Sequence, residues 1–100
     1  MSRPLAKEDS VEELLVRRVR ALGGRCEKMA MKGRRGFPDR LVILPGGRIH
    51  LVETKRPVGG RLLPHQISLH AIYKALGATV AVVRNSEDID RLLSPSDAGT

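Results

Sequence analysis

Hydrophobic residues recur along this chain with two periods, and the change of period separates helices from strands. Residues 10–22 show the helical period, with an apolar stripe at Leu15, Val16, Val19 and Leu22. Ser10 is the expected N-cap, and Gly23-Gly24 is the expected end of the helix. The pattern therefore predicts an amphipathic first helix from Ser10 to Leu22.

Short apolar runs between glycine and proline signals predict four strands. The first is expected from Arg25 to Lys32. Two more, Arg40 to Leu44 and Ile49 to Lys55, flank the turn signal Pro45-Gly46-Gly47 and so predict an antiparallel hairpin. Thr79 to Val83 is apolar almost throughout, which predicts a central or near-central buried strand.

Two further helices complete the predicted order. Pro64 suits the first turn of a helix that runs to about Leu76 before Gly77. Ser86 is the expected cap of a short last helix ending near Leu93. The fold class is therefore α/β, with the order αβββαβα and a mixed sheet flanked by helices. We expect an N-terminal extension over 1–9, one domain over 10–94 and a flexible tail over 95–100.

The strongest chemical signal is Gly36-Phe37-Pro38-Asp39, a thirteen-residue interval, and then Glu53-Thr54-Lys55. A hairpin turning near Gly46-Gly47 places Asp39 opposite Glu53, and period-two alternation puts Glu53 and Lys55 on one face. Two neighbouring carboxylates repel each other unless a cation lies between them. Because Mg²⁺ and Mn²⁺ prefer oxygen ligands, this arrangement suits metal-assisted phosphodiester cleavage.

Charge is concentrated around these residues. The chain has a net charge of +7, and residues 17–61 hold thirteen Lys/Arg against three acids. A polyphosphate backbone is the obvious partner of such a region, although a solvated surface is the alternative explanation. Phe37 and Tyr73 are the only aromatic residues, so base stacking has little support. Recognition of the backbone and shape of duplex or branched DNA fits better.

These residues resemble the VRR-NUC domain, a branch of the PD-(D/E)xK nuclease superfamily. The resemblance rests on Gly-x-Pro-Asp, the hairpin, Glu-x-Lys, Gly60-Arg61-Leu62 and Gln66, and it covers about Glu8 to Leu93. It implies a restriction-endonuclease-like core and a Mg²⁺- or Mn²⁺-dependent endodeoxyribonuclease. Stand-alone members, typical of phage and bacteria, resemble Holliday-junction resolvases and often dimerise. The resemblance therefore implies a homodimer that cuts four-way junctions in DNA repair or recombination.

The resemblance also assigns roles to residues. It implies that Asp39, Glu53 and the Thr54 backbone carbonyl hold the metal and that Gln66 helps to orient Lys55, the water or a phosphate. Lys55 would either orient the attacking water or donate to the phosphate. The expected DNA contacts are Lys28, Arg34, Arg35 and Arg61. His65 and His70 are expected to be surface or packing residues, and no His/Cys pair has zinc spacing.

Glu12 is a further candidate metal ligand. It shares the apolar stripe of the first helix, whereas Glu13 aligns with Arg17 and Arg20 on the solvent side. An acid on a buried face needs a partner, and a metal is one candidate, as in the superfamily, where a first-helix glutamate often completes the metal site. The alternative is an acid favoured by the dipole at the N-terminal end of a helix.

The composition favours one cellular location, and it is also compatible with two functions other than catalysis. The single Cys26 and the absence of a signal-peptide or membrane-span pattern favour a cytoplasmic location in a bacterial or phage-infected cell. We expect no membrane partner and no small-molecule substrate. A non-catalytic nucleic-acid-binding module would also need the basic stretch. A scaffolding α/β domain would use Asp39 as a turn cap and pair Glu53 with Lys55 or Arg56.

Overall fold

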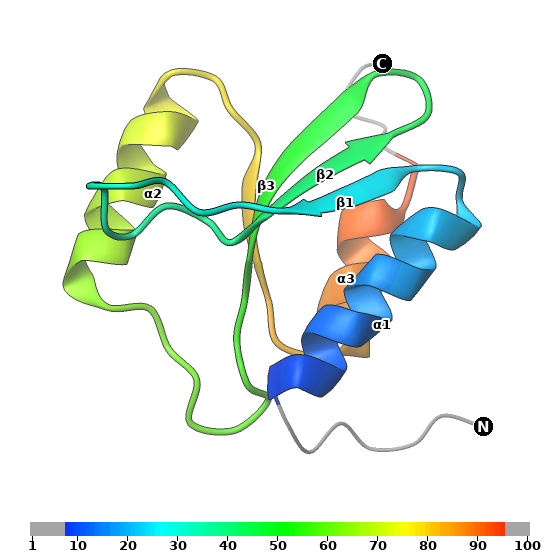
Figure 1. The fold of residues 1–100 in the computed structure, drawn as a ribbon, viewed down its shortest axis with the longest axis horizontal. Helices are drawn as coiled ribbons and strands as arrows, with labels where there is room; N and C mark the ends of the chain where they lie inside the picture. The colour runs from blue at the N-terminus through cyan, green and yellow to red at the C-terminus, as the bar shows by residue number, and fades with distance from the viewer. Residues whose placement is uncertain (1–7, 96–100) are drawn as a thin grey trace.

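The computed structural model describes residues 8–95, which form three helices and one sheet (Figure 1). The order along the chain confirms the predicted αβββαβα. The elements are α1 (Glu8–Ala21), β1 (Arg25–Lys28), β2 (Arg40–Leu44), β3 (Arg48–Thr54), α2 (Pro64–Ala75), β4 (Val80–Val83) and α3 (Ser86–Leu93). None of the helices in this part of the chain is long and apolar enough to cross a bilayer.

The sheet is mixed, with the strand order β1-β2-β3-β4. β2 and β3 form the predicted hairpin, in a register that pairs Arg40 with Val52 and Leu44 with Arg48. β1 runs antiparallel to β2, and β4 runs parallel to β3 after the crossover through α2. One step beyond the last hairpin pair, Asp39 therefore lies opposite Glu53.

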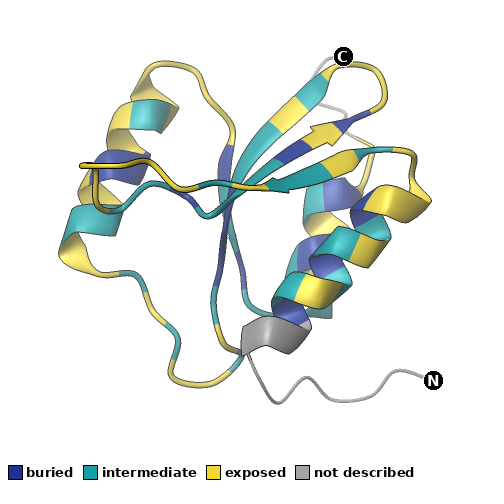
Figure 2. Ribbon diagram, viewed as in Figure 1, coloured by how far each residue is buried: buried dark blue, intermediate teal, exposed yellow. Residues whose placement is uncertain are grey.

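The helices lie on both faces of the sheet (Figure 1). α1 and α3 contact each other and pack on one face, whereas α2 lies on the other face and contacts β4. The core lies between the α1–α3 pair and the sheet, as the buried positions of Figure 2 show. Its fully buried side chains come from both layers: Val11, Leu15, Val19, Val42, Val52 and Ile89. The β2–β3 hairpin, at whose open end Asp39 and Glu53 lie, is therefore packed against this core through Val42 and Val52.

Several predicted boundaries were wrong, for local reasons. The first strand ends at Lys28 and not at Lys32, because residues 29–39 form a loop closed by a Met29 N–H to Asp39 carbonyl hydrogen bond of 2.8 Å. The first helix begins at Glu8, so Ser10 is a helical residue and not the N-cap. The last helix is capped by Asn85, whose side-chain oxygen accepts from the Asp88 N–H, and not by Ser86.

The predicted central or near-central position of β4 was also wrong, although Val80 and Val83 are buried as expected. Among the described strands, β4 is an edge strand that pairs with β3 alone. Its apolar run is explained by the helices, because α3 contacts one side of β4 and α2 the other. Val80 and Val83 are consequently buried without a second neighbouring strand. An apolar run indicates that both faces of a strand are covered. Helices can cover both faces even when the strand lies at the edge of the sheet.

Candidate active site

Asp39 and Glu53 lie close together at the open end of the hairpin, near enough for the charge of Asp39 to act on Glu53. Both oxygens of Asp39 accept hydrogen bonds from Thr54: Oδ1 from the backbone N–H at 3.1 Å, and Oδ2 from the hydroxyl at 2.8 Å. The Asp39 carboxylate is thereby fixed in position against the end of β3. Thr54 was expected to contribute its backbone carbonyl, and its hydroxyl is an additional anchor that sequence reasoning missed.

Both carboxyl groups have raised pKa values. Burial is the largest cause of the raised pKa of Asp39. The charge of the nearby Glu12 raises this pKa further, whereas the two hydrogen bonds from Thr54 lower it. Burial is also the main reason that the pKa of Glu53 is raised, and repulsion by Asp39 adds to it. Each carboxylate therefore lies where its negative charge is incompletely compensated. A cation between them would relieve both the repulsion and the lost hydration.

Lys55 and Gln66 complete a hydrogen-bonded group around Glu53. Lys55 Nζ lies 3.4 Å from Glu53 Oε2 and donates to Gln66 Oε1 at 3.2 Å. The Gln66 side-chain amide in turn donates from Nε2 to Glu53 Oε2 at 3.1 Å. Among the described residues, the second oxygen of Glu53 receives no hydrogen bond. The structure thus brings together Asp39, Glu53, Lys55 and Gln66, and one Glu53 oxygen remains available to a ligand.

Gln66 is held in place by its position in the first turn of α2. It is the third helical residue, and its Oε1 accepts the backbone N–H of the N-cap residue Leu63 at 2.8 Å. This is one half of a capping box; leucine has no side-chain oxygen to supply the other half. With these three contacts, Gln66 is not an ordinary amide on the surface of a helix.

The loop before Asp39 packs closely against the start of α2. Gly36 has φ +90°, and a Cβ placed on it would lie 3.0 Å from the His65 carbonyl oxygen and 3.3 Å from the Gln66 Cα. The rings of Phe37 and Tyr73 meet edge to face, with centroids 5.7 Å apart. The two aromatic residues thus brace the loop against α2, consistent with the expectation that they do not stack on bases.

We expect Gly36→Ala to impair the site more than Gly33→Ala does. Both glycines have positive φ, which costs an alanine about 1–2 kcal/mol, but only Gly36 has a neighbour within 4 Å. The added methyl group at position 36 must push α2 away and so displace Gln66. The required shift is a few tenths of an ångström, which disturbs the hydrogen bonds of Gln66 to Lys55 and Glu53 and so lowers the rate. Cleavage rates of both variants test this, and equal rates would contradict it.

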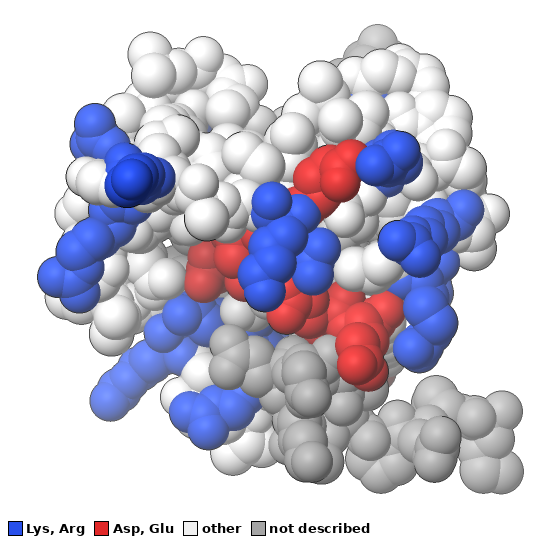
Figure 3. All heavy atoms as spheres, in the orientation of Figure 1, with Lys and Arg blue, Asp and Glu red and all other residues white. Residues whose placement is uncertain are grey.

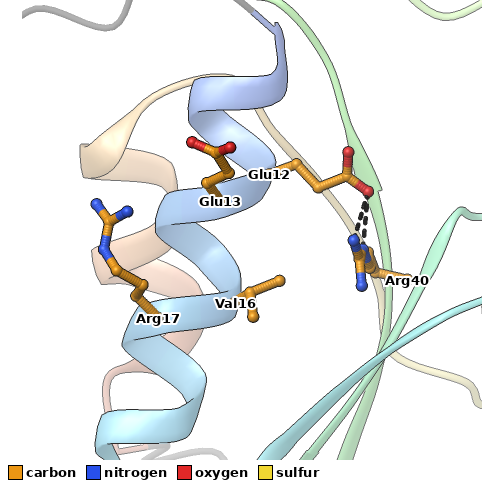
Figure 4. Close-up of a pocket in the computed structure, with 5 residues that line it drawn as sticks. All are labelled: Glu12, Glu13, Val16, Arg17 and Arg40. Carbon is orange, nitrogen blue, oxygen red and sulfur yellow. Dashed lines mark hydrogen bonds and ion pairs between the residues drawn. The ribbon is translucent and has the colours of Figure 1, made fainter.

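Glu12 has a partner that the sequence did not reveal. Arg40 Nε donates to Glu12 Oε2 at 2.8 Å, Arg40 Nη2 forms an ion pair with the same oxygen at 2.8 Å, and Arg40 Nη1 donates to the Cys26 carbonyl at 3.3 Å. The pair lies in a hollow of about 540 Å³ between α1 and β2, which Glu13, Val16 and Arg17 also line (Figure 4). Within residues 11–95, no three His, Cys, Asp or Glu side chains gather closely enough to hold a metal. The structure therefore does not bring Glu12 together with Asp39 and Glu53.

The expected DNA contacts lie around this centre. Lys28 is exposed at the end of β1, Arg34 and Arg35 are exposed in the loop before Asp39, and Arg61 is exposed in the loop after β3. Figure 3 shows acidic side chains in a band across the middle of this face, with basic side chains on both sides. Arg84, which sequence reasoning missed, ties the Arg61 loop to β4 by donating from Nε to the Gly60 carbonyl at 3.2 Å.

The residues present fit a hard divalent cation in part. Two mutually repelling carboxylates and a free Glu53 oxygen form an oxygen-only donor set of the kind that Mg²⁺ and Mn²⁺ prefer. Those ions also keep several waters, so two carboxylates suffice to begin a site. The carboxylate of Glu12 is close enough for its charge to raise the pKa of Asp39, but Glu12 is engaged in an ion pair with Arg40.

Two comparisons with known proteins agree with this geometry. The chain is 47% identical over 89 residues to a protein named "Putative nuclease p44" of Acyrthosiphon pisum secondary endosymbiont phage 1, covering 89% of this chain and 94% of that protein. A solved structure described as a VRR_NUC domain matches with a TM-score of 0.80 and 40% identity, covering 86% of this chain and 92% of that one. No protein-family model matches the sequence. With this identity over nearly the full length of both proteins, and the same fold, the chain belongs to the VRR-NUC family.

Proposed function

We propose that this protein is a metal-dependent endonuclease that hydrolyses phosphodiester bonds of DNA. The observation that carries the proposal is the close pair of Asp39 and Glu53, with Lys55 and Gln66 bonded to Glu53. A phage protein named as a nuclease shares almost the whole chain. A module that only binds DNA has no need of two carboxyl groups with raised pKa values, one buried and one partly buried, inside a basic region.

Asp39, Glu53 and the Thr54 carbonyl would hold Mg²⁺ or Mn²⁺. Such an ion lowers the pKa of a bound water and neutralises charge that develops on the scissile phosphate. Thr54, which is next to Glu53 in the chain, holds the Asp39 carboxylate in a fixed position at the end of β3. Glu12 is proposed as a further carboxylate ligand once it is released from its ion pair with Arg40.

Lys55 and Gln66 would act on the substrate side of the site. The Lys55 ammonium lies within reach of Glu53 and can turn its remaining hydrogens to a water or to a phosphate oxygen. Gln66 joins Lys55 to Glu53 and so restricts where the ammonium points. A fixed donor of this kind stabilises the transition state without reorganisation during the reaction.

Arg34 and Arg35 would hold the DNA backbone, together with Lys28 and Arg61. We expect the double variant Arg34→Ala, Arg35→Ala to weaken binding to all DNA sequences and to lower the slope of log K against log salt by about 2. The reason is that exposed arginines on a braced loop contact phosphates and not base edges. Binding isotherms at several salt concentrations measure the slope. An unchanged slope would remove these arginines from the interface.

The proposed active unit is a homodimer that prefers four-way junctions. Apolar side chains are exposed on α2 and at its C-cap, with Ile67, Ile72 and the C-cap Leu76 at 55%, 54% and 80%, and β4 is an edge strand in the described sheet. Exposed apolar groups beside a free strand edge offer a surface to a second copy. Two symmetric strands of a junction also call for two active sites.

Cleavage of a panel of DNAs tests the proposed substrate. We expect four-way junctions to be cut faster than linear duplex of the same sequence, and we expect a dimer by sedimentation at micromolar concentration. The Leu76→Glu variant should lower the dimer fraction, because it places a charge on the exposed face of α2. A monomer that cuts linear and branched DNA equally would overturn the dimer and junction proposals. The metal-dependent chemistry would not be affected by that result.

A further inference from the structure

The Glu12–Arg40 pair lies directly beside the proposed metal site. Arg40 follows Asp39 in the chain and is the first residue of β2, and Glu12 faces it from α1. Figure 4 shows the two side chains pointing toward each other across the hollow between these elements. Glu12 is near enough for its charge to raise the pKa of Asp39, and Arg40 opposes that effect. A carboxylate at this distance is a potential metal ligand that is already engaged.

The geometry of the pair shows how firmly Glu12 is held. Two guanidinium nitrogens lie 2.8 Å from the same carboxylate oxygen, one as a hydrogen-bond donor and one as an ion-pair contact, and a third donates to the Cys26 carbonyl. The side chains are mostly shielded, with 15% of Arg40 and 21% of Glu12 exposed. Charge-assisted bonds in such a partly buried position are stronger than those of exposed ion pairs. As this pair places it, Glu12 does not form a group with Asp39 and Glu53 that could hold a metal, so its carboxylate has to move away from Arg40 before it can become a ligand.

We infer that Arg40 is a positioning residue that withholds Glu12 from the metal site in the free protein. This inference rests on the proposed metal-dependent function, which it deepens. Glu12 then becomes a ligand only when another anion takes the guanidinium. A DNA phosphate is chemically suited to this, because guanidinium groups bind phosphate oxygens in pairs. The hollow beside Arg40 is large and also presents the exposed Arg17, so a phosphate can approach there.

Mn²⁺ binding to the protein without DNA tests this inference. The affinity is measured by electron paramagnetic resonance of free Mn²⁺ for the unmodified protein, Glu12→Gln, Arg40→Met and the double variant. Glu12→Gln alone should change the affinity less than about twofold, since a withheld residue contributes little. Arg40→Met should tighten binding about tenfold, because an added carboxylate ligand raises affinity for a hard cation. The double variant should lose that gain.

The double variant separates a ligand from a simple charge effect. Removing the Arg40 charge alone also favours a cation, but that gain would persist after Glu12→Gln. Glu13→Gln is the matched control, since Glu13 lines the same hollow and carries the same charge but is exposed on α1. It should not remove the gain in the Arg40→Met background. Persistence of the gain in the Glu12→Gln, Arg40→Met protein would overturn the inference.

Two results keep failure of the inference distinct from failure of the proposed function. If Asp39→Asn does not weaken Mn²⁺ binding at all, the metal site itself is wrong. If Asp39→Asn weakens binding but Glu12→Gln weakens it equally in both backgrounds, Glu12 is a permanent ligand and only the inference falls. Arg40→Lys supplies a second background in case Arg40→Met does not fold. It keeps the charge but has no planar fork, and the same Glu12-dependent gain should appear at smaller size.

Discussion

Asp39→Asn and Glu53→Gln are each expected to lower the DNA cleavage rate by at least about 10²–10³-fold, the size of the loss when one charge-stabilising group is removed. Both changes keep the shape of the side chain and remove its charge, so the cation loses one of two facing carboxylates. Initial rates on a junction and on a duplex measure the effect. Glu13→Gln, on the exposed side of α1, is the control and should cut DNA at the normal rate.

Stability measurements separate this loss from unfolding. The pKa of Glu53 is raised by burial and by Asp39, so the folded protein binds a proton more tightly there than the unfolded chain does. The stability contributed by protonated Glu53 is present at low pH and is lost as pH rises through the folded pKa. Glu53→Gln removes this loss, so without metal it should unfold at an equal or higher temperature than the unmodified protein at neutral pH. The difference in unfolding temperature between the two proteins should shrink as pH falls. If the Glu53→Gln protein is instead much less stable than the unmodified protein at neutral pH, Glu53 has a structural role.

Lys55→Met is expected to reduce cleavage by a similar factor of about 10²–10³, with little change in DNA affinity. Methionine keeps the apolar stem and removes the ammonium that bonds Glu53 and Gln66. Because the binding surface has many other cations, one missing charge changes affinity little. Single-turnover rates and binding isotherms separate the two quantities. Lys74→Met, which removes an exposed lysine from α2, is the control. Equal losses of rate and of affinity in Lys55→Met would make Lys55 a binding residue only.

The site could be predicted largely because its residues follow local rules. The turn at Gly46-Gly47 sets the hairpin register, and that register alone places Asp39 opposite Glu53. Period-two alternation then puts Lys55 beside Glu53, as their 3.4 Å contact confirms. Gln66 follows from Pro64, which begins α2 two residues earlier. The element order was predictable for the same reason, since each run carried its own turn or cap signals.

What could not be predicted depends on contacts between distant parts of the chain. Arg40 follows Asp39 as an ordinary strand residue, and only the packing of α1 on the sheet shows that it holds Glu12. The edge position of β4 depends on helices on both of its faces, which an apolar run does not reveal. Asn85 and Ser86 are both good N-caps, and the choice is made by the Asp88 N–H that Asn85 reaches.

The most direct test of the central claim is cleavage of DNA by the purified protein in Mg²⁺, in Mn²⁺ and in excess EDTA, beside Asp39→Asn. We expect cutting in either metal, none in EDTA, restoration when Mg²⁺ is added back, and almost none from Asp39→Asn under any condition. Undiminished cutting in EDTA, or full activity of Asp39→Asn in Mg²⁺, would contradict a metal site built on Asp39 and Glu53.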